Sequence, residues 1–197
     1  MTSAPDHIAV VVLAGGEGRR IGGGKPLRRL AGQTLLDRAL AQARTVSDMV
    51  AVAVRDPAQA AGVDGARLIP DAPWEGPLGG LAAALVFARQ AGRTAVLTLP
   101  CDMPLVPPDL AGRLTAALDG HGAALASSGG RLHPVCGLWR TDRLGALSAY
   151  AATGQRSLKG FAAGIGFVAV DWPAEPVDPF FNVNTAADLG RAEALLA

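Results

Sequence analysis

A glycine-rich segment with three cationic side chains is the part of the sequence best suited to chemistry. Residues 15–24 include six glycines, and Arg19, Arg20 and Lys25 lie within seven positions of one another. Backbone N–H groups of glycine can approach phosphate oxygens closely because no side chain intervenes. With its three cations, the segment predicts a loop that binds a triphosphate of high negative charge. The alternative is a surface loop with solvated charges.

Two common phosphate-binding motifs do not fit this segment. A P-loop ending at Lys25 requires glycine at position 19 and Ser or Thr at position 26, where the sequence has Arg19 and Pro26. The dinucleotide fingerprint beginning at Gly16 requires glycine at position 21, which is Ile21. The segment therefore predicts a third type of phosphate-binding loop and argues against a dehydrogenase.

Two aspartates follow short apolar runs in the first half of the chain. Asp102 stands between Pro100 and Pro104, and Asp71 follows residues 67–69. A carboxylate at the end of a strand can hold Mg²⁺, a hard cation that binds through one or two carboxylates together with substrate phosphates. Either aspartate could instead cap a helix or serve as a turn residue.

Apolar runs of strand length alternate with helical patterns, and these elements must position the candidate residues. The β-branched run 8–13 predicts a strand buried on both faces. The alternation predicts a mostly parallel sheet with helices on both faces, which binds ligands at the carboxyl edge of its strands. The predicted strands are 8–13, 48–54, 67–69, 94–99, 123–126, 135–139 and 167–170, and the predicted helices are 34–43, 77–90, 107–118, 141–151, 156–163 and 186–196.

Length and composition fit one α/β domain. The chain has 197 residues, of which 50% are hydrophobic and 5% aromatic, so the core is built mainly from Ala, Val and Leu. A formal net charge of +1 gives no reason to expect nucleic acid or a membrane surface as a partner. Cys101 and Cys136 form no CxxC pair. No signal peptide and no apolar run of about 20 residues is found, so a cytoplasmic protein is expected.

The glycine-rich segment and three other segments resemble those of the molybdenum cofactor guanylyltransferases, a family of nucleotidyltransferases. The first is LAGGEGRRIGGGKPL at residues 13–27, and the second is LPCDMPLVPPDL at residues 99–110. The third is GPLGG at residues 76–80, and the fourth is FNVNT at residues 181–185. The likeness extends in the same order over about residues 8–190.

The resemblance implies a fold, a reaction and a division of the chain. The implied fold is a single-domain, Rossmann-like three-layer sandwich of the nucleotide-diphospho-sugar transferase type. Residues 1–197 would form one domain, with an NTP-binding half at about 8–120 and an acceptor-binding half at about 121–197. The implied reaction transfers GMP from GTP to molybdopterin, with or without molybdenum, and releases pyrophosphate with Mg²⁺ as cofactor. Proteins that supply molybdopterin, or molybdoenzyme chaperones, would be its protein partners.

Residue roles follow from the same resemblance. Arg19, Lys25 and Asp102 would be catalytic, and Asp102 would be the Mg²⁺ ligand. The implied nucleotide-binding residues are Leu13, Ala14, Gly15, Gly16, Gly18, Arg19, Lys25, Asp71, Gly79 and Asp102, and the implied acceptor-binding residues are His133, Arg156, Lys159, Asn182 and Asn184.

Each acceptor candidate also has a purely structural interpretation. Asn184 or Thr185 could cap the closing helix, and Thr185 could do so while Asn182 points into the cleft. His133 could pack structurally, and Arg156 and Lys159 could lie on a solvated helix face.

Three other functions remain open at this point. In cytidylyltransferases acting on the same pterin the loop tends to begin LAAG, with Gly before the metal-binding Asp, so LAGG and PCD favour guanine here. A sugar- or alditol-phosphate nucleotidyltransferase and a non-catalytic GTP-binding module are the others. One departure concerns the base. Some relatives carry an Asn near the end of the second strand that helps to hold the guanine, where this chain has residues 52–54 (VAV).

Overall fold

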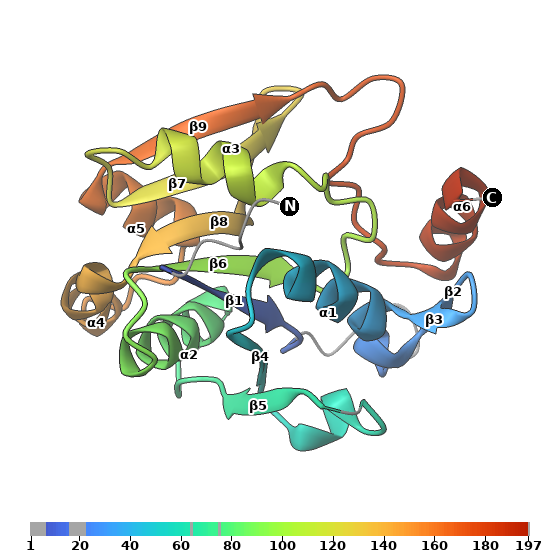
Figure 1. Ribbon diagram of the computed structural model, residues 1–197, viewed down its shortest axis with the longest axis horizontal. Helices are drawn as coiled ribbons and strands as arrows, with labels where there is room; N and C mark the ends of the chain where they lie inside the picture. The colour runs from blue at the N-terminus through green and yellow to red at the C-terminus, as the bar shows by residue number, and fades with distance from the viewer. Residues whose placement is uncertain (1–6, 16–22, 64, 75, 197) are drawn as a thin grey trace.

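A seven-stranded sheet runs through the centre of the protein, between two layers of helices (Figure 1). The computed structural model describes residues 7–15, 23–63, 65–74 and 76–196. The strand order is β5-β4-β1-β6-β8-β7-β9. The strands are β1 (Ile8–Leu13), β4 (Val50–Val54), β5 (Arg67–Pro70), β6 (Ala95–Pro100), β7 (Ala123–Ser128), β8 (Arg131–Arg140) and β9 (Phe167–Trp172).

The sheet is mostly parallel, as the sequence predicts. Strands β5, β4, β1 and β6 are parallel to one another, and β7 is parallel to β9. Only β8 runs antiparallel, to both β6 and β7, because the Gly129–Gly130 turn makes a tight hairpin of β7 and β8. The carboxyl ends of the six other strands therefore meet at one edge, and β8 begins there.

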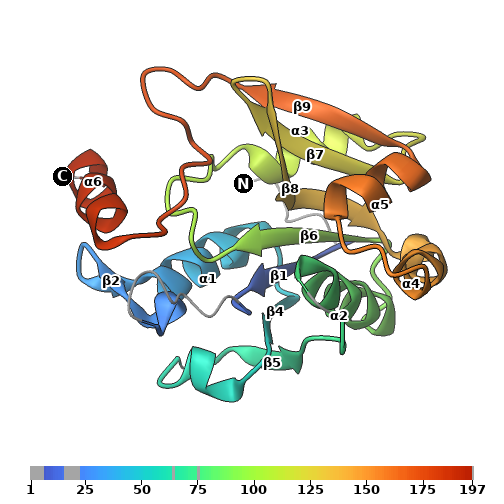
Figure 2. The same cartoon turned by 180° about the vertical axis from the view of Figure 1, so that it is seen from behind.

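Two helical layers complete the predicted three-layer sandwich. Helices α1 (Leu35–Val46) and α3 (Leu110–Ala117) cover one face (Figure 1). Helices α2 (Pro77–Gln90), α4 (Leu144–Ala152) and α5 (Leu158–Ile165) cover the other face (Figure 2). Along β1 the side chains alternate between the two cores, as the strand period of two requires. This is why the run 8–13 is apolar throughout.

The last helix, α6 (Ala186–Leu196), stands apart from both layers (Figure 2). It lies beside a small antiparallel ribbon formed by β2 (Arg29–Leu30) and β3 (Gln33–Thr34), which the sequence did not predict. A third apolar cluster joins these elements, and its fully or nearly fully buried members are Leu30, Leu35, Val183 and Ala192. The closing helix is thus anchored to the chain that directly follows the glycine-rich segment.

The predicted strand at 135–139 is longer in the structure. Strand β8 begins at Arg131, because the first residues after the hairpin turn already pair with β7. The register shifts between Leu125 and Ala126, and Pro134 lies in the unpaired stretch opposite this shift. A bulge of this kind tolerates proline, which cannot donate a ladder hydrogen bond. The other predicted strands agree with the observed ones to within two residues.

Three helices begin two or three residues later than predicted. Helix α3 begins at Leu110, after Pro107 and Pro108, and a short 3₁₀ turn at Thr141–Arg143 precedes α4. Helix α5 begins at Leu158 because the Ser157 side chain accepts a hydrogen bond from Gly160 N and caps the helix. Arg156 therefore precedes this helix. In the part of the chain that the structure describes, no helix is both long enough and apolar enough to span a membrane.

We predict that Leu97→Ala, in the central strand β6, lowers the free energy of unfolding by about 2–5 kcal/mol, because its side chain is only 1% exposed and truncation leaves a cavity. Urea denaturation measures this loss. Leu195→Ala is the matched control, since Leu195 is 41% exposed and its truncation should change stability by less than about 0.5 kcal/mol. Equal losses for both variants would contradict the assignment of the core.

Candidate functional site

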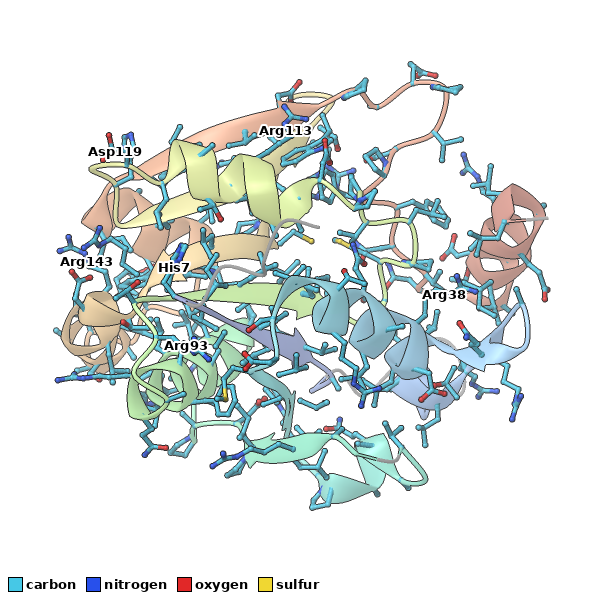
Figure 3. All side chains as sticks on the ribbon, viewed as in Figure 1. His7, Arg38, Arg93, Arg113, Asp119 and Arg143 are labelled. Carbon is cyan, nitrogen blue, oxygen red and sulfur yellow. The ribbon has the colours of Figure 1, made fainter. Side chains whose placement is uncertain are left out.

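Three side chains from distant parts of the sequence meet at the carboxyl edge of the central strands. Lys25 Nζ lies 2.6 Å from Asp102 Oδ2 and donates a second hydrogen bond to Asn184 Oδ1 at 2.8 Å. The Lys25 side chain is 9% exposed, whereas that of Asp102 is 25% exposed. A nearly buried ammonium is thus held by a carboxylate that remains partly open to solvent. In Figure 3, His7 and Arg93, which precede β1 and β6, lie at the opposite end of these strands.

The backbone brings Lys25 and Asp102 to this edge. Gly23 and Gly24 have φ values of 77° and 58°, in the left-handed region that glycine adopts without strain. They lead into a 3₁₀ turn over Lys25–Leu27, and the Lys25 side chain points inward from its start. Asp102 comes two residues after β6, where Cys101 N donates to Leu13 O of the neighbouring strand at 3.3 Å.

Asn184 is fixed by hydrogen bonds on both sides. Val183 N donates to Asp102 O at 2.8 Å. Asn184 N and Thr185 N donate to Asp188 Oδ2 at 3.0 and 2.8 Å, and Asp188 N donates to Thr185 Oγ1 at 3.1 Å. The hydrogen bond from Asn184, followed by those from Thr185, lowers the pKa of the Asp188 carboxyl. Thr185 therefore caps α6 while the amide of Asn184 contacts Lys25, and Asn182 is half-buried two residues earlier.

Asp102 is a carboxylate suited to a metal ion. Among the described residues, no group of three or more His, Cys, Asp or Glu side chains could hold a metal by itself. Asp102 alone fits Mg²⁺, because that ion can bind one protein carboxylate and complete its coordination with water and substrate phosphates. The donor set therefore fits a metal that arrives with a nucleotide.

The two buried cysteines near the site are not candidate nucleophiles. Burial, assisted by the charge of Asp102, raises the pKa of the Cys101 thiol to about 12. Burial likewise raises the pKa of Cys136, whose thiol contacts the Met103 sulfur at 3.5 Å. The thiolate is the reactive form, so neither residue would attack a substrate near neutral pH.

A second group of residues surrounds the start of the glycine-rich segment. A Cβ added to Gly15 would lie 2.7 Å from Asp71 Oδ2, so a larger residue here would require the Asp71 carboxylate to move. Arg55 Nε lies 3.7 Å from the same oxygen, and Asp71 Oδ1 is buried without a hydrogen-bond partner in the described part of the chain. Burial raises the pKa of Asp71, and the charge of Arg55 partly opposes this effect. Leu13 and Ala14 directly precede Gly15.

Gly79 has a packing role at the start of α2. A Cβ at this position would lie 2.6 Å from Ala72 O and 3.0 Å from Trp74 O. Glycine thus lets the helix pack against the turn that carries Asp71. The predicted residues Gly16, Gly18 and Arg19 lie outside the described residues.

His133 belongs to a buried network. Its Nε2 lies 2.8 Å from Ser128 Oγ, and Ser128 Oγ donates to Asp178 Oδ1 at 2.8 Å. The imidazole stacks on the Phe180 ring at a centroid distance of 4.7 Å. Burial lowers the pKa of His133. These contacts place the residue in the support of the segment that leads to Asn182. A contact of His133 with an acceptor stays a prediction.

Arg156, which precedes α5, and Lys159, in its first turn, are both exposed. The carbonyl oxygen of Arg156 is 4.0 Å from the position that a Cβ on Gly76 would occupy. Arg156 therefore adjoins the start of α2, next to the group around Asp71. The structure brings Lys25, Asp102 and Asn184 into direct contact, and it places His133 and Arg156 at other points of the same edge.

Two features of the site were not predicted from the sequence. Arg55 directly follows β4 at the carboxyl edge, and its position after a predicted strand was a usable signal. The hydrogen bonds of Ser128 and Asp178 to the His133 network depend on long-range packing that no local pattern reveals.

A cavity of about 420 Å³ opens between β5, α2 and α4, but none of the predicted site residues lines it.

The structure is a three-layer sandwich whose first strand leads into a glycine-rich segment. Lys25 and Asp102 are paired at the carboxyl edge of its sheet. This fold and this site are those of a nucleotidyltransferase. The chain belongs to the family of proteins with a MobA-like NTP transferase domain, whose model matches residues 10–168. This match spans β1 to β9 and includes Lys25, Asp71 and Asp102.

Relatives in this family match nearly the whole chain. The molybdenum cofactor guanylyltransferase of Cereibacter sphaeroides (strain ATCC 17029 / ATH 2.4.9) is 42% identical over 189 residues, covering 94% of this chain and 95% of the relative. That of Bradyrhizobium sp. (strain ORS 278) is 40% identical over 208 residues, covering 100% and 96%. The crystal structure of molybdopterin-guanine dinucleotide biosynthesis protein A from Archaeoglobus fulgidus superposes with a TM-score of 0.76 at 25% identity, covering 95% and 98%.

Gly15→Ala should destabilise the protein by about 1–3 kcal/mol, because the new methyl group requires Asp71 or its backbone to move. Urea denaturation measures the change. Gly112→Ala in α3 is the control, since a Cβ there meets no atom within 4 Å and alanine favours a helix. A Gly15→Ala variant as stable as the control would show that the close approach imposes no constraint.

The buried network predicts a pH dependence of stability. Because the pKa of His133 is lowered in the folded state, the unfolded chain binds its proton at higher pH. The free energy of unfolding should fall as pH drops below the ordinary histidine value of about 6.5. Denaturation at several pH values should show that His133→Gln has a smaller loss than the unsubstituted chain. His121→Gln should keep the full loss, and identical profiles for both variants would contradict this assignment.

Proposed function

We propose that this protein transfers GMP from GTP to molybdopterin in a Mg²⁺-dependent reaction that yields molybdopterin guanine dinucleotide and pyrophosphate. The observation that carries the proposal is the contact of Lys25 with Asp102 and Asn184 at the carboxyl edge of the sheet. The full-length similarity to proteins named molybdenum cofactor guanylyltransferase supports the choice of nucleotide and acceptor.

The chemistry requires positioning and charge stabilisation rather than a protein nucleophile. A terminal phosphate oxygen of molybdopterin attacks the α-phosphorus of GTP and forms a new P–O bond. The bond from the α-phosphorus to the bridging oxygen of pyrophosphate breaks, and its electron pair leaves with pyrophosphate. The attacking phosphate is already ionised, so a general base is not needed.

Lys25 is suited to neutralise charge on the phosphates. A lysine ammonium carries three N–H donors, and two of those of Lys25 point to Asp102 and Asn184 within the described part of the chain. The third can reach a phosphate oxygen. Because the ammonium is buried and held from two sides, it is in place before the reaction begins, as electrostatic stabilisation of a transition state requires.

Asp102 would hold Mg²⁺, which would neutralise phosphate charge when bound with the nucleotide. The partial exposure of its carboxylate leaves it accessible to such a complex. Asn184 would keep Lys25 oriented when the Asp102 carboxylate binds the metal. Arg19 remains a candidate for stabilising the departing pyrophosphate.

Calorimetric titration with GTP, CTP, UTP and ATP, each with Mg²⁺, tests this proposal. We expect the tightest binding for GTP and a loss of about tenfold or more in Lys25→Ala, because the variant lacks the buried cation. Arg143→Ala is the control, since its side chain is 41% exposed, is paired with Asp142 and follows β8 at the opposite edge.

The same titration distinguishes the sister activities. Preference for CTP would move the function to a pterin cytidylyltransferase that shares the fold and loop. An equal loss of GTP affinity in Lys25→Ala and Arg143→Ala would contradict the proposed role of Lys25 in nucleotide binding. Absence of binding for all four nucleotides in the unsubstituted protein would contradict the proposal.

A further inference from the structure

The end of β4 lacks a polar side chain where the base of a nucleotide would lie. Ala53 pairs with Leu13 of β1, and Ala14 N donates to Ala53 O at 3.0 Å. Ala53 and Val54 are buried and apolar. A side chain that recognises the base next to Leu13 and Gly15 must therefore come from a neighbouring position.

Arg55 occupies that neighbouring position. Its Cγ lies 3.5 Å from the point that a Cβ on Gly15 would occupy, so its aliphatic stem packs beside the start of the glycine-rich segment. Nε lies 3.7 Å from Asp71 Oδ2, and Nη2 donates to Gly76 O at 3.3 Å. The head group is thus aligned from one side by the turn after β5 and the start of α2.

These contacts engage only one edge of the guanidinium. Nε lies near Asp71, and Nη2 uses one of its two N–H groups for Gly76 O. The other edge, made by Nη1 and the second Nη2–H, has no hydrogen-bond partner among the described residues. The side chain as a whole is 43% exposed, which leaves room for a ligand at its head group. These donors belong to a side chain whose Cγ packs beside Gly15.

We propose that Arg55 is a specificity-determining residue that recognises guanine through the Nη1–Nη2 edge of its guanidinium. The inference rests on the proposed function and on the nucleotide-binding roles that the resemblance implies for Leu13 and Gly15. The acceptors would be O6 and N7 of guanine, two adjacent oxygen and nitrogen atoms that match a pair of parallel donors. Arg55 would supply a base contact that the apolar end of β4 does not.

The chemistry of this edge explains discrimination between purines. Adenine has the acceptor N7, but it carries an amino group where guanine has O6, so a donor of Arg55 would face another donor. The wrong base would leave a charged N–H unpaired, which costs more than the loss of an ordinary contact. Arg55 therefore selects guanine over adenine without contacting the N2 amino group.

A purely structural role explains the arrangement less well. An ion pair with a partly exposed Arg at 3.7 Å is longer than a hydrogen bond and contributes little to stability. Asp71 is nearly buried and aligns the Arg55 side chain, whereas the donors on the far edge of Arg55 have no structural use within the described part of the chain.

Binding of four purine nucleotides to matched variants tests the inference. We would measure GTP, ITP, 7-deaza-GTP and ATP with Mg²⁺ against the unsubstituted protein, Arg55→Met and Arg55→Lys. Arg140→Met is the control, because Arg140 is also 43% exposed and ion-paired but ends β8 at the opposite edge of the sheet. All four proteins should unfold at similar urea concentrations.

The unsubstituted protein should bind 7-deaza-GTP about tenfold more weakly than GTP, because the analogue lacks N7. Arg55→Met should lose about tenfold to a hundredfold in affinity for GTP and for ITP, which keeps O6 and N7, and should bind GTP and 7-deaza-GTP equally. Arg55→Lys should retain charge but lose most of the preference for GTP over ATP. Arg140→Met should behave as the unsubstituted protein.

Two results would overturn the inference while leaving the proposed function intact. One is an Arg55→Met variant that keeps the preference of the unsubstituted protein for GTP over ATP. The other is an equal loss of affinity for GTP and 7-deaza-GTP, which would mean that Arg55 acts only through Asp71. If the unsubstituted protein does not prefer GTP, the proposed function itself fails.

Discussion

The buried ammonium of Lys25 is the constraint on which the site depends. An isolated charge out of water is costly, and it is tolerated only when it is paired and hydrogen-bonded. Here the partners are Asp102, which follows the central strand, and Asn184, which precedes the last helix. Three chain segments must therefore meet before Lys25 can be buried. Correct folding of the carboxyl edge thus also brings together the charges that the proposed phosphate chemistry needs.

The placement of α6 follows from this requirement. The helix does not pack on the sheet, and instead its capping residues hold Asn184 against Lys25 while its apolar side contacts the β2–β3 ribbon. The ribbon directly follows the 3₁₀ turn that begins with Lys25. The segments that carry Lys25 and Asn184 are thus joined to each other, whereas the group around Asp71 follows the parallel strands β4 and β5.

Much of the fold could be predicted because buried strands and amphipathic helices leave strong periodic patterns. The β2–β3 ribbon could not, since two-residue strands have no periodicity. Lys25 and Asp102 could be assigned from motifs, but their contact with Asn184 joins residues 159 positions apart and appears only in three dimensions. The stacking of His133 on Phe180 likewise joins residues 47 positions apart and could not be predicted from a local pattern. No sequence motif marks Arg55, because the role proposed for it depends on contacts with residues that follow neighbouring strands.

The transfer reaction itself tests the central claim most directly. The purified protein would be incubated with molybdopterin, Mg²⁺ and GTP labelled either at the α- or at the γ-phosphate. We expect the α-label in a dinucleotide product and the γ-label in pyrophosphate, with far less transfer from CTP and none detectable with Lys25→Ala. Release of the α-label only as free GMP, or equal transfer from CTP, would contradict the assignment of this site as a guanylyl transfer centre.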